Sequence, residues 1–150
     1  MHFTFSFFFV IFVTTSILIV MIFSVNFVRF FAWISIITSI FHTIGEGYFI
    51  YKYGQPFLQT LVDVIAVSLL FFGGKVTLKN NNSLGVLCGA WGFTFCLNYR
   101  AWVWRYYAKI EGVADANTDT VGTILFFLLI FSCVCFILSV LINLPKTKIV

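Results

Sequence analysis

Long apolar stretches separated by short polar breaks run through the whole chain. Backbone groups in lipid must find hydrogen-bond partners within the segment that crosses it, so stretches of this kind predict membrane-spanning helices. About 20 apolar residues are enough to cross the hydrocarbon core. The pattern predicts an initial helix followed by a four-helix core, at about 3–26, 30–53, 57–74, 84–108 and 119–144. We therefore expect an all-α integral membrane bundle that occupies residues 1–150 as a single domain.

The breaks between these stretches are rich in glycine, proline and polar residues. Residues 54–56 (Gly-Gln-Pro) predict a turn, because proline lacks an N–H group and disfavours helix before it. Residues 73–75 (Gly-Gly-Lys) and the polar run 79–83 are expected to end the third helix. The second stretch is less typical, because Gly-Glu-Gly at 45–47 interrupts it. It predicts either a full span or a broken helix that lies partly in a cavity.

The composition narrows the class of protein. The 150 residues are 61% hydrophobic and only 9% charged, which excludes a soluble enzyme and a nucleic-acid binder. The net charge of +4 comes from lysines and arginines in loops and at the C-terminus. The four cysteines have no C-x-x-C spacing, so we predict no metal site. Haem would need a pair of axial ligands and only His42 is available in the membrane, so we also predict no cofactor.

The distribution of lysine and arginine predicts an orientation. With five spans, one side of the membrane receives Arg29, Lys75, Lys79, Lys146 and Lys148, and the other receives Lys52, Arg105 and Lys109. The positive-inside rule then places the first side, and with it the C-terminus, in the cytosol. The chain ends with lysines at the third and fifth positions from its last residue, similar to a dilysine retrieval signal. In a eukaryote this pattern would indicate the endoplasmic-reticulum membrane.

Some charged or titratable residues lie well inside the apolar stretches, where a charge costs roughly 2.5–3.5 kcal/mol or more. They are His42, Glu46, Asp63 and Arg100. At about 1.5 Å per residue, Glu46 and Arg100 both lie about 24 Å from the starts of their helices. The helix that carries Asp63 crosses in the opposite direction, and Asp63 lies about 10 Å from its start. Glu46, Asp63 and Arg100 therefore fall in the same third of the membrane. His42 is one turn from Glu46 on the same face, and Asn98 lies near that depth.

Two interpretations of this polar cluster remain open. In the first, Arg100 holds Glu46 or Asp63 in a fork and the cluster fixes the packing of the helices. In the second, the cluster lines a polar pocket in which a carboxylate or His42 handles protons. Desolvation and a neighbouring like charge both raise the pKa of a carboxyl group, which would let one of the two carboxylates act as a general acid.

The stretch His42-Thr-Ile-Gly-Glu46-Gly-Tyr48-Phe49 resembles a signature of the emopamil-binding proteins, a family of sterol isomerases. The family also has an initial helix before a four-helix core. The resemblance implies that His42 and Glu46 handle protons together with an acidic residue on the next core helix, where Asp63 stands here. It implies a shift of a double bond by protonation and deprotonation.

A tryptophan on the final helix of that family stabilises the carbocation through its ring face. Residues 119–144 contain no tryptophan, so Trp91 or Trp102 would take this role from the preceding helix. Tyr48 of the motif, Asn98 and Arg100 complete the set of predicted ligand-binding residues.

Two functional classes follow from these patterns. The first is a small membrane-complex subunit or a lipid-handling protein whose polar cluster is structural or binds a ligand. The second is an isomerase that resembles the emopamil-binding proteins, with His42, Glu46 and Asp63 as catalytic residues. The expected partner is a membrane lipid or a sterol-like ligand, and the chain could also form a homo-oligomer or part of a membrane complex.

Overall fold

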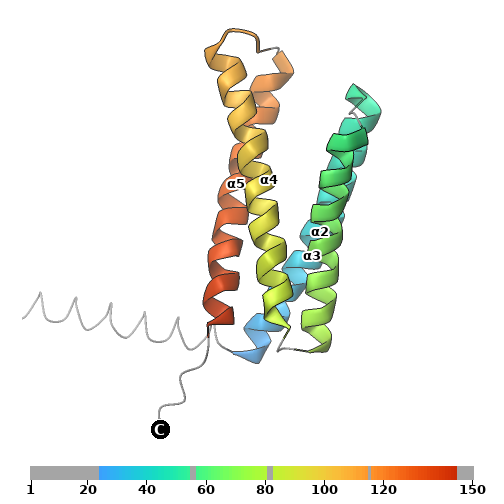
Figure 1. The fold of residues 1–150 in the computed structure, drawn as a ribbon, viewed down its shortest axis with the longest axis vertical. Coiled ribbons are helices and arrows are strands. Elements are labelled where there is room, and N and C mark those ends of the chain that lie inside the picture. Colours follow the sequence, from blue (N-terminus) through green and yellow to red (C-terminus); the bar gives the residue numbers. More distant parts are fainter. Residues whose placement is uncertain (1–23, 55–56, 81–82, 115, 145–150) are drawn as a thin grey trace, which may run out of the picture.

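The computed structural model describes residues 24–54, 57–80, 83–114 and 116–144. Four helices fill these ranges, namely α2 (Val25–Tyr53), α3 (Phe57–Lys79), α4 (Leu84–Ile110) and α5 (Ala116–Asn143), and the described residues contain no strand (Figure 1). The all-α prediction is therefore confirmed for this part of the chain. Most of the predicted helix at 3–26 lies outside the described residues, as do the C-terminal lysines.

Three of the helices are long and apolar enough to cross a membrane, at Val25–Lys52, Thr60–Lys79 and Thr118–Asn143. This finding is consistent with an integral membrane protein. The α4 helix is not among the three, and its second half carries Arg100, Arg105 and Lys109. The predicted number of five spans is not established by the described helices.

The second helix is longer than predicted and is unbroken. It begins at Val25 instead of residue 30, because Ser24 caps it and its Oγ accepts a hydrogen bond from the Phe27 N–H at 3.1 Å. Residues 45–47 stay helical, so the broken-helix alternative is wrong. The helix ends at Gly54, whose φ of 66° suits glycine and whose N–H donates to the Ile50 carbonyl.

The third helix also extends past its predicted end. Gly73 and Gly74 do not terminate α3, which continues to Lys79. The two glycines instead let neighbouring helices approach closely. A Cβ on Gly74 would lie 2.7 Å from the Ala32 carbonyl oxygen of α2, and one on Gly73 would lie 3.3 Å from the Leu87 Cα of α4. Small residues at helix contacts are the usual means of close packing in membranes.

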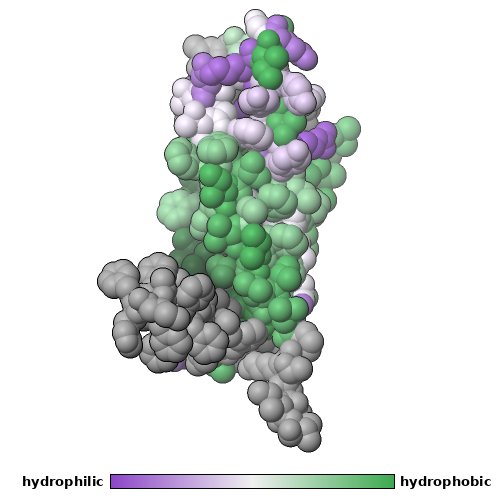
Figure 2. Space-filling view, turned by 90° about the vertical axis from the view of Figure 1, so that its left-hand side faces the viewer, coloured by the Kyte–Doolittle hydropathy of each residue, from purple (hydrophilic) through white to green (hydrophobic). Residues whose placement is uncertain are grey.

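The four helices form two antiparallel hairpins, α2–α3 and α4–α5, which α3 and α4 join (Figure 1). We call the end where α2 and α4 begin the inner end, and the end where they finish, at Tyr53 and Ile110, the outer end. On the face drawn in Figure 2, apolar side chains cover the middle of the molecule and polar ones gather towards the outer end. Apolar surface around the middle of a bundle is what a lipid environment favours.

The buried residues occupy only part of the bundle. In the described part of the chain, all of them lie within 28–39 of α2, 66–77 of α3, 87–98 of α4 and 132–142 of α5. These four stretches adjoin one another at the inner half, around Phe31, Leu70, Leu87 and Trp91. The outer half of the bundle has no fully buried side chain among the described residues, although α4 and α5 still touch there through Trp102 and Phe126.

Candidate functional site

The helix contacts fix which residues lie at the same height. Gly74 of α3 lies opposite Ala32 and Ile36 of α2, and neighbouring helices run antiparallel. Counting outwards from this contact places Asp63 level with residues 45–46 of α2.

Counting residues from the contact between α3 and α4 places residues of α4 at the same height. Gly73 of α3 lies beside Leu87 of α4, which places Asp63 level with residues 97–98 of α4. The amide of Asn98 contacts Ser132 of α5 directly. We call this height, with His42, Glu46, Asp63 and Asn98, the polar level. It agrees with the common depth expected from the sequence, and it coincides with the height at which burial ends.

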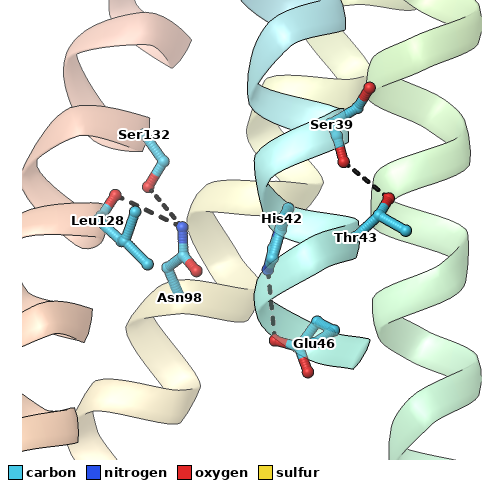
Figure 3. Close-up of polar contacts among 7 residues, drawn as sticks. All are labelled: Ser39, His42, Thr43, Glu46, Asn98, Leu128 and Ser132. Atoms are coloured by element: carbon cyan, nitrogen blue, oxygen red, sulfur yellow. Dashed lines mark hydrogen bonds and ion pairs between the residues drawn. The ribbon is translucent and has the colours of Figure 1, made fainter. Parts of the chain in front are cut away.

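His42 and Glu46 face each other along α2. The His42 Nε2 lies 3.5 Å from the Glu46 Oε1, with the two side chains 14% and 26% exposed (Figure 3). The residues are one helical turn apart, which explains why their side chains meet. Protonation of the imidazole would convert this contact into an ion pair, whereas a neutral imidazole can donate one hydrogen bond to the carboxylate. The pair can therefore both donate and accept hydrogen bonds.

Asp63 and Arg100 lie on other helices. Asp63 is partly buried on α3, whereas Arg100 is exposed on α4, two residues outward from Asn98. Arg100 forms no salt bridge with any residue that the structure describes, so the predicted fork with Glu46 or Asp63 is not formed. The structure thus brings together His42 and Glu46, and it places Asp63 at their height without Arg100 as a common partner.

Asn98 belongs to the α4–α5 contact. Its Nδ2 donates to the Ser132 Oγ at 3.2 Å and lies 3.4 Å from the Leu128 carbonyl oxygen (Figure 3). The Asn98 side chain is buried, and it points towards α5. Its contacts give it a structural role within the second hairpin.

The predicted aromatic ligand-binding residues have different surroundings. Trp91 is fully buried in the inner half, where its Nε1 donates to the Ser35 Oγ at 2.9 Å. Trp102 lies one turn outward from Asn98, and its ring is 5.3 Å from Tyr106 and 5.8 Å from Phe126. These rings pack within and beside the α4–α5 hairpin.

Tyr48 lies on α2 beyond the polar level and is 55% exposed. The Lys52 Nζ lies 5.6 Å from the centre of its ring, a cation–π contact at the outer end. Tyr48 is therefore exposed on the outer side of the polar level and contacts Lys52 of its own helix.

Sequence reasoning missed the small polar residues that join the helices. Ser35 and Ser132 each accept a side-chain hydrogen bond from α4. Both are also anchored to their own helix, to the Phe31 and Leu129 carbonyl oxygens. Their only signal in the sequence is a serine within an otherwise apolar stretch. Among the described residues, no group of three His, Cys, Asp or Glu side chains is arranged to hold a metal ion.

Replacing Asn98 by leucine is expected to lower the free energy of unfolding by about 1 kcal/mol, a typical value for one interhelical hydrogen bond in a membrane protein. Leucine has a similar volume but cannot donate to Ser132. Denaturation by sodium dodecyl sulfate, followed by circular dichroism, measures the change. Asn143→Leu is the matched control, because Asn143 is exposed at the end of α5. An equal loss in both variants would contradict a specific role for Asn98.

Comparison with protein-family models, with curated proteins and with solved structures finds no match for this chain.

Proposed function

We propose that the chain is a membrane protein that binds a lipid, with the lipid's polar group at the polar level and its apolar body against the outer half of the helices. The observation that carries the proposal is the coincidence of two boundaries. The buried core of the bundle ends at the height where His42, Glu46, Asp63 and Asn98 lie. At this height the His42–Glu46 pair, 14% and 26% exposed, offers a ligand polar contacts that lipid chains cannot supply.

The chemistry of the polar level supports a ligand with a weakly basic or hydroxyl group. His42 and Glu46 together can both donate and accept hydrogen bonds. A sterol-like amine places one cationic group on a rigid apolar body, which matches one carboxylate below uncovered apolar helix faces. In a variant of this proposal the chain is a subunit of a membrane complex. A helix of another protein, and not a lipid, then covers the apolar faces of the outer half.

A second candidate function is isomerisation of a sterol-like lipid, as in the emopamil-binding proteins. The specific observation in its favour is the contact of the two motif residues, His42 and Glu46, at 3.5 Å. In this reaction one group of the pair would protonate a double bond and a second base, for which Asp63 is the candidate, would remove a proton from a neighbouring carbon. Transfer of solvent deuterium into a sterol-like substrate would distinguish catalysis from binding alone.

Binding of a fluorescent sterol-like amine to the detergent-purified protein tests the proposal. We expect His42→Ala and Glu46→Gln to weaken binding by about tenfold or more, since each removes a charged or polar partner worth about 1.5–3 kcal/mol. Asp119→Asn is the control, because it removes a carboxylate that lies far along α5 from the polar level. Binding that is equally strong in all three variants would contradict a site at His42 and Glu46. Absence of binding in the wild type would favour the complex subunit.

A further inference from the structure

A second candidate site lies at the outer end of the α4–α5 hairpin. A pocket of about 560 Å³ opens there between the end of α4, the connection that follows it and the start of α5. Four of its lining residues carry distinct chemistry, namely Trp104, Arg105, Tyr107 and Glu111. This pocket shares no residue with the polar level, and nothing in the proposed function above depends on it.

The pocket lies at the outer end of the apolar stretch of α5 that is long enough to cross a membrane, which begins at the lining residue Thr118. A Cβ on Gly122 would lie 3.8 Å from the Arg105 Cβ, so Arg105 is level with the start of the apolar part of α5, at Val121. The Lys109 Nζ and the Asp119 Oδ1, 2.7 Å apart, lie further out and are both exposed. Tryptophan and tyrosine rings at this height are typical of the zone of lipid headgroups.

The walls of the pocket are held in place by the end of α4. Gly112 has a φ of 71°, its N–H donates to the Lys109 carbonyl, and the Val113 N–H donates to the Ala108 carbonyl. These two hydrogen bonds form the Schellman motif that ends many helices. Because the motif fixes the backbone on both sides of Glu111, it holds that residue's main chain at the edge of the pocket. The Lys109–Asp119 contact ties the end of α4 to the start of α5.

The two opposite charges in the pocket do not neutralise each other. Arg105 and Glu111 both line it, yet neither forms a salt bridge with a residue that the structure describes. The Arg105 Nη1 lies 3.4 Å from the Ala101 carbonyl oxygen, which leaves its other N–H groups available. A ligand that carries one anion and one cation could satisfy both side chains together.

We propose that this pocket binds the headgroup of a phospholipid that carries both a phosphate and an amine. The Arg105 guanidinium takes the phosphate, because its planar array of N–H donors matches phosphate oxygens. The ammonium group of the lipid lies between the Glu111 carboxylate and the rings of Trp104 and Tyr107, which attract cations through their faces. A phosphatidylcholine or phosphatidylethanolamine headgroup has this pair of charges, whereas phosphatidylglycerol has the phosphate only.

Arg100 adds to the positive potential on this side of α4. It lies one turn inward of Trp104 on the same helix face, it is exposed, and it has no salt-bridge partner among the described residues. A long arginine side chain in an apolar zone extends towards the polar interface. The interface on its own helix is the end that carries the pocket.

Retention of lipids from mixed membranes tests the headgroup site. The full chain is reconstituted in nanodiscs that contain equal amounts of phosphatidylcholine and phosphatidylglycerol with identical acyl chains. Native mass spectrometry of the released protein then counts the bound lipids of each kind. We expect the wild type to retain phosphatidylcholine in excess. Arg105→Gln should lower retention of both lipids by about tenfold, because it removes the phosphate ligand that they share.

Glu111→Gln should remove the preference for choline and leave phosphatidylglycerol retention unchanged. Arg29→Gln, which changes an exposed arginine at the inner end, is the matched control and should behave as the wild type. Equal retention of the two lipids by the wild type would overturn the proposal. So would retention in Arg105→Gln and Glu111→Gln that equals that of Arg29→Gln.

Two further measurements exclude other causes of a positive result. Circular dichroism should show the same helix content and melting temperature for all variants, since Glu111 is exposed and Arg105 lies at the end of the bundle. Phosphocholine without acyl chains, at the same concentration, should bind far less than the lipid does. If it binds equally well, the ligand is a small soluble zwitterion and the assignment to a membrane lipid is wrong.

Discussion

Trp91→Ala is expected to destabilise the protein more than any other single truncation in its core. Trp91 is fully buried, its ring lies 5.9 Å from Phe31 and 5.7 Å from Phe131, and its Nε1 donates to Ser35. Truncation of a buried aromatic residue to alanine costs about 3–5 kcal/mol in soluble proteins. We expect about 3 kcal/mol here, because lipid removes the water-transfer part of the loss and leaves the cavity and the lost contacts.

Unfolding in sodium dodecyl sulfate, monitored by circular dichroism, measures this effect. Trp33→Ala is the matched control, since Trp33 is 54% exposed on α2 and its loss should change the stability little. A double-mutant cycle of Trp91→Phe with Ser35→Ala isolates the hydrogen bond between α4 and α2. If Trp91→Ala and Trp33→Ala destabilise the protein equally, the inner half does not contain the core described above.

The apolar pattern predicted the helices of the described region well, because length and hydrophobicity decide which segments cross a membrane. The common height of Glu46, Asp63 and Asn98 could also be predicted from the sequence, since it depends only on the alternating direction of the helices. The contact between His42 and Glu46 follows from their spacing of four residues. These features depend on neighbouring residues or on the number of residues along a helix, and both can be read from a single sequence.

The predictions that failed depended on tertiary contacts. Gly73 and Gly74 have the composition of a helix end, but inside α3 they are contact points for α2 and α4. Tertiary packing here outweighs the low helix propensity of glycine. The expected fork at Arg100 failed because depth fixes only one coordinate of a side chain. The rotation of α4 about its axis turns Asn98 towards α5 and leaves Arg100 exposed.

The position of the buried core was also beyond the reach of the sequence pattern. Apolar residues occur along the full length of each helix, so composition cannot indicate that only the inner half packs tightly. In that half the small residues, such as Ala32, Ser35, Ala66 and Gly74, are buried where the helices meet, whereas a Cβ on Gly45 or Gly47 of the outer half would meet no atom within 4 Å. Bulky apolar residues of the outer half remain exposed, and Phe41 is 70% exposed.

Gly74→Ala is expected to destabilise the α2–α3 hairpin by about 1–3 kcal/mol, the usual cost of overpacking a tight contact. The new methyl group would lie 2.7 Å from the Ala32 carbonyl oxygen and 2.8 Å from the Ile36 Cγ1. A backbone oxygen cannot rotate away as a flexible side chain can, so the two helices must separate. The loss should exceed the gain of up to about 1 kcal/mol that alanine brings as a better helix former.

Gly89→Ala is the control for this substitution, because a Cβ on Gly89 of α4 meets no atom within 4 Å. It should leave the stability unchanged or raise it, since only helix propensity acts there. Opposite signs for the two glycines, measured by the same denaturation experiment, would establish that α2 and α3 touch at Gly74. If Gly74→Ala stabilises the protein as much as Gly89→Ala does, the α2–α3 contact is looser than described. The register that places Asp63 level with Glu46 would then be unsupported.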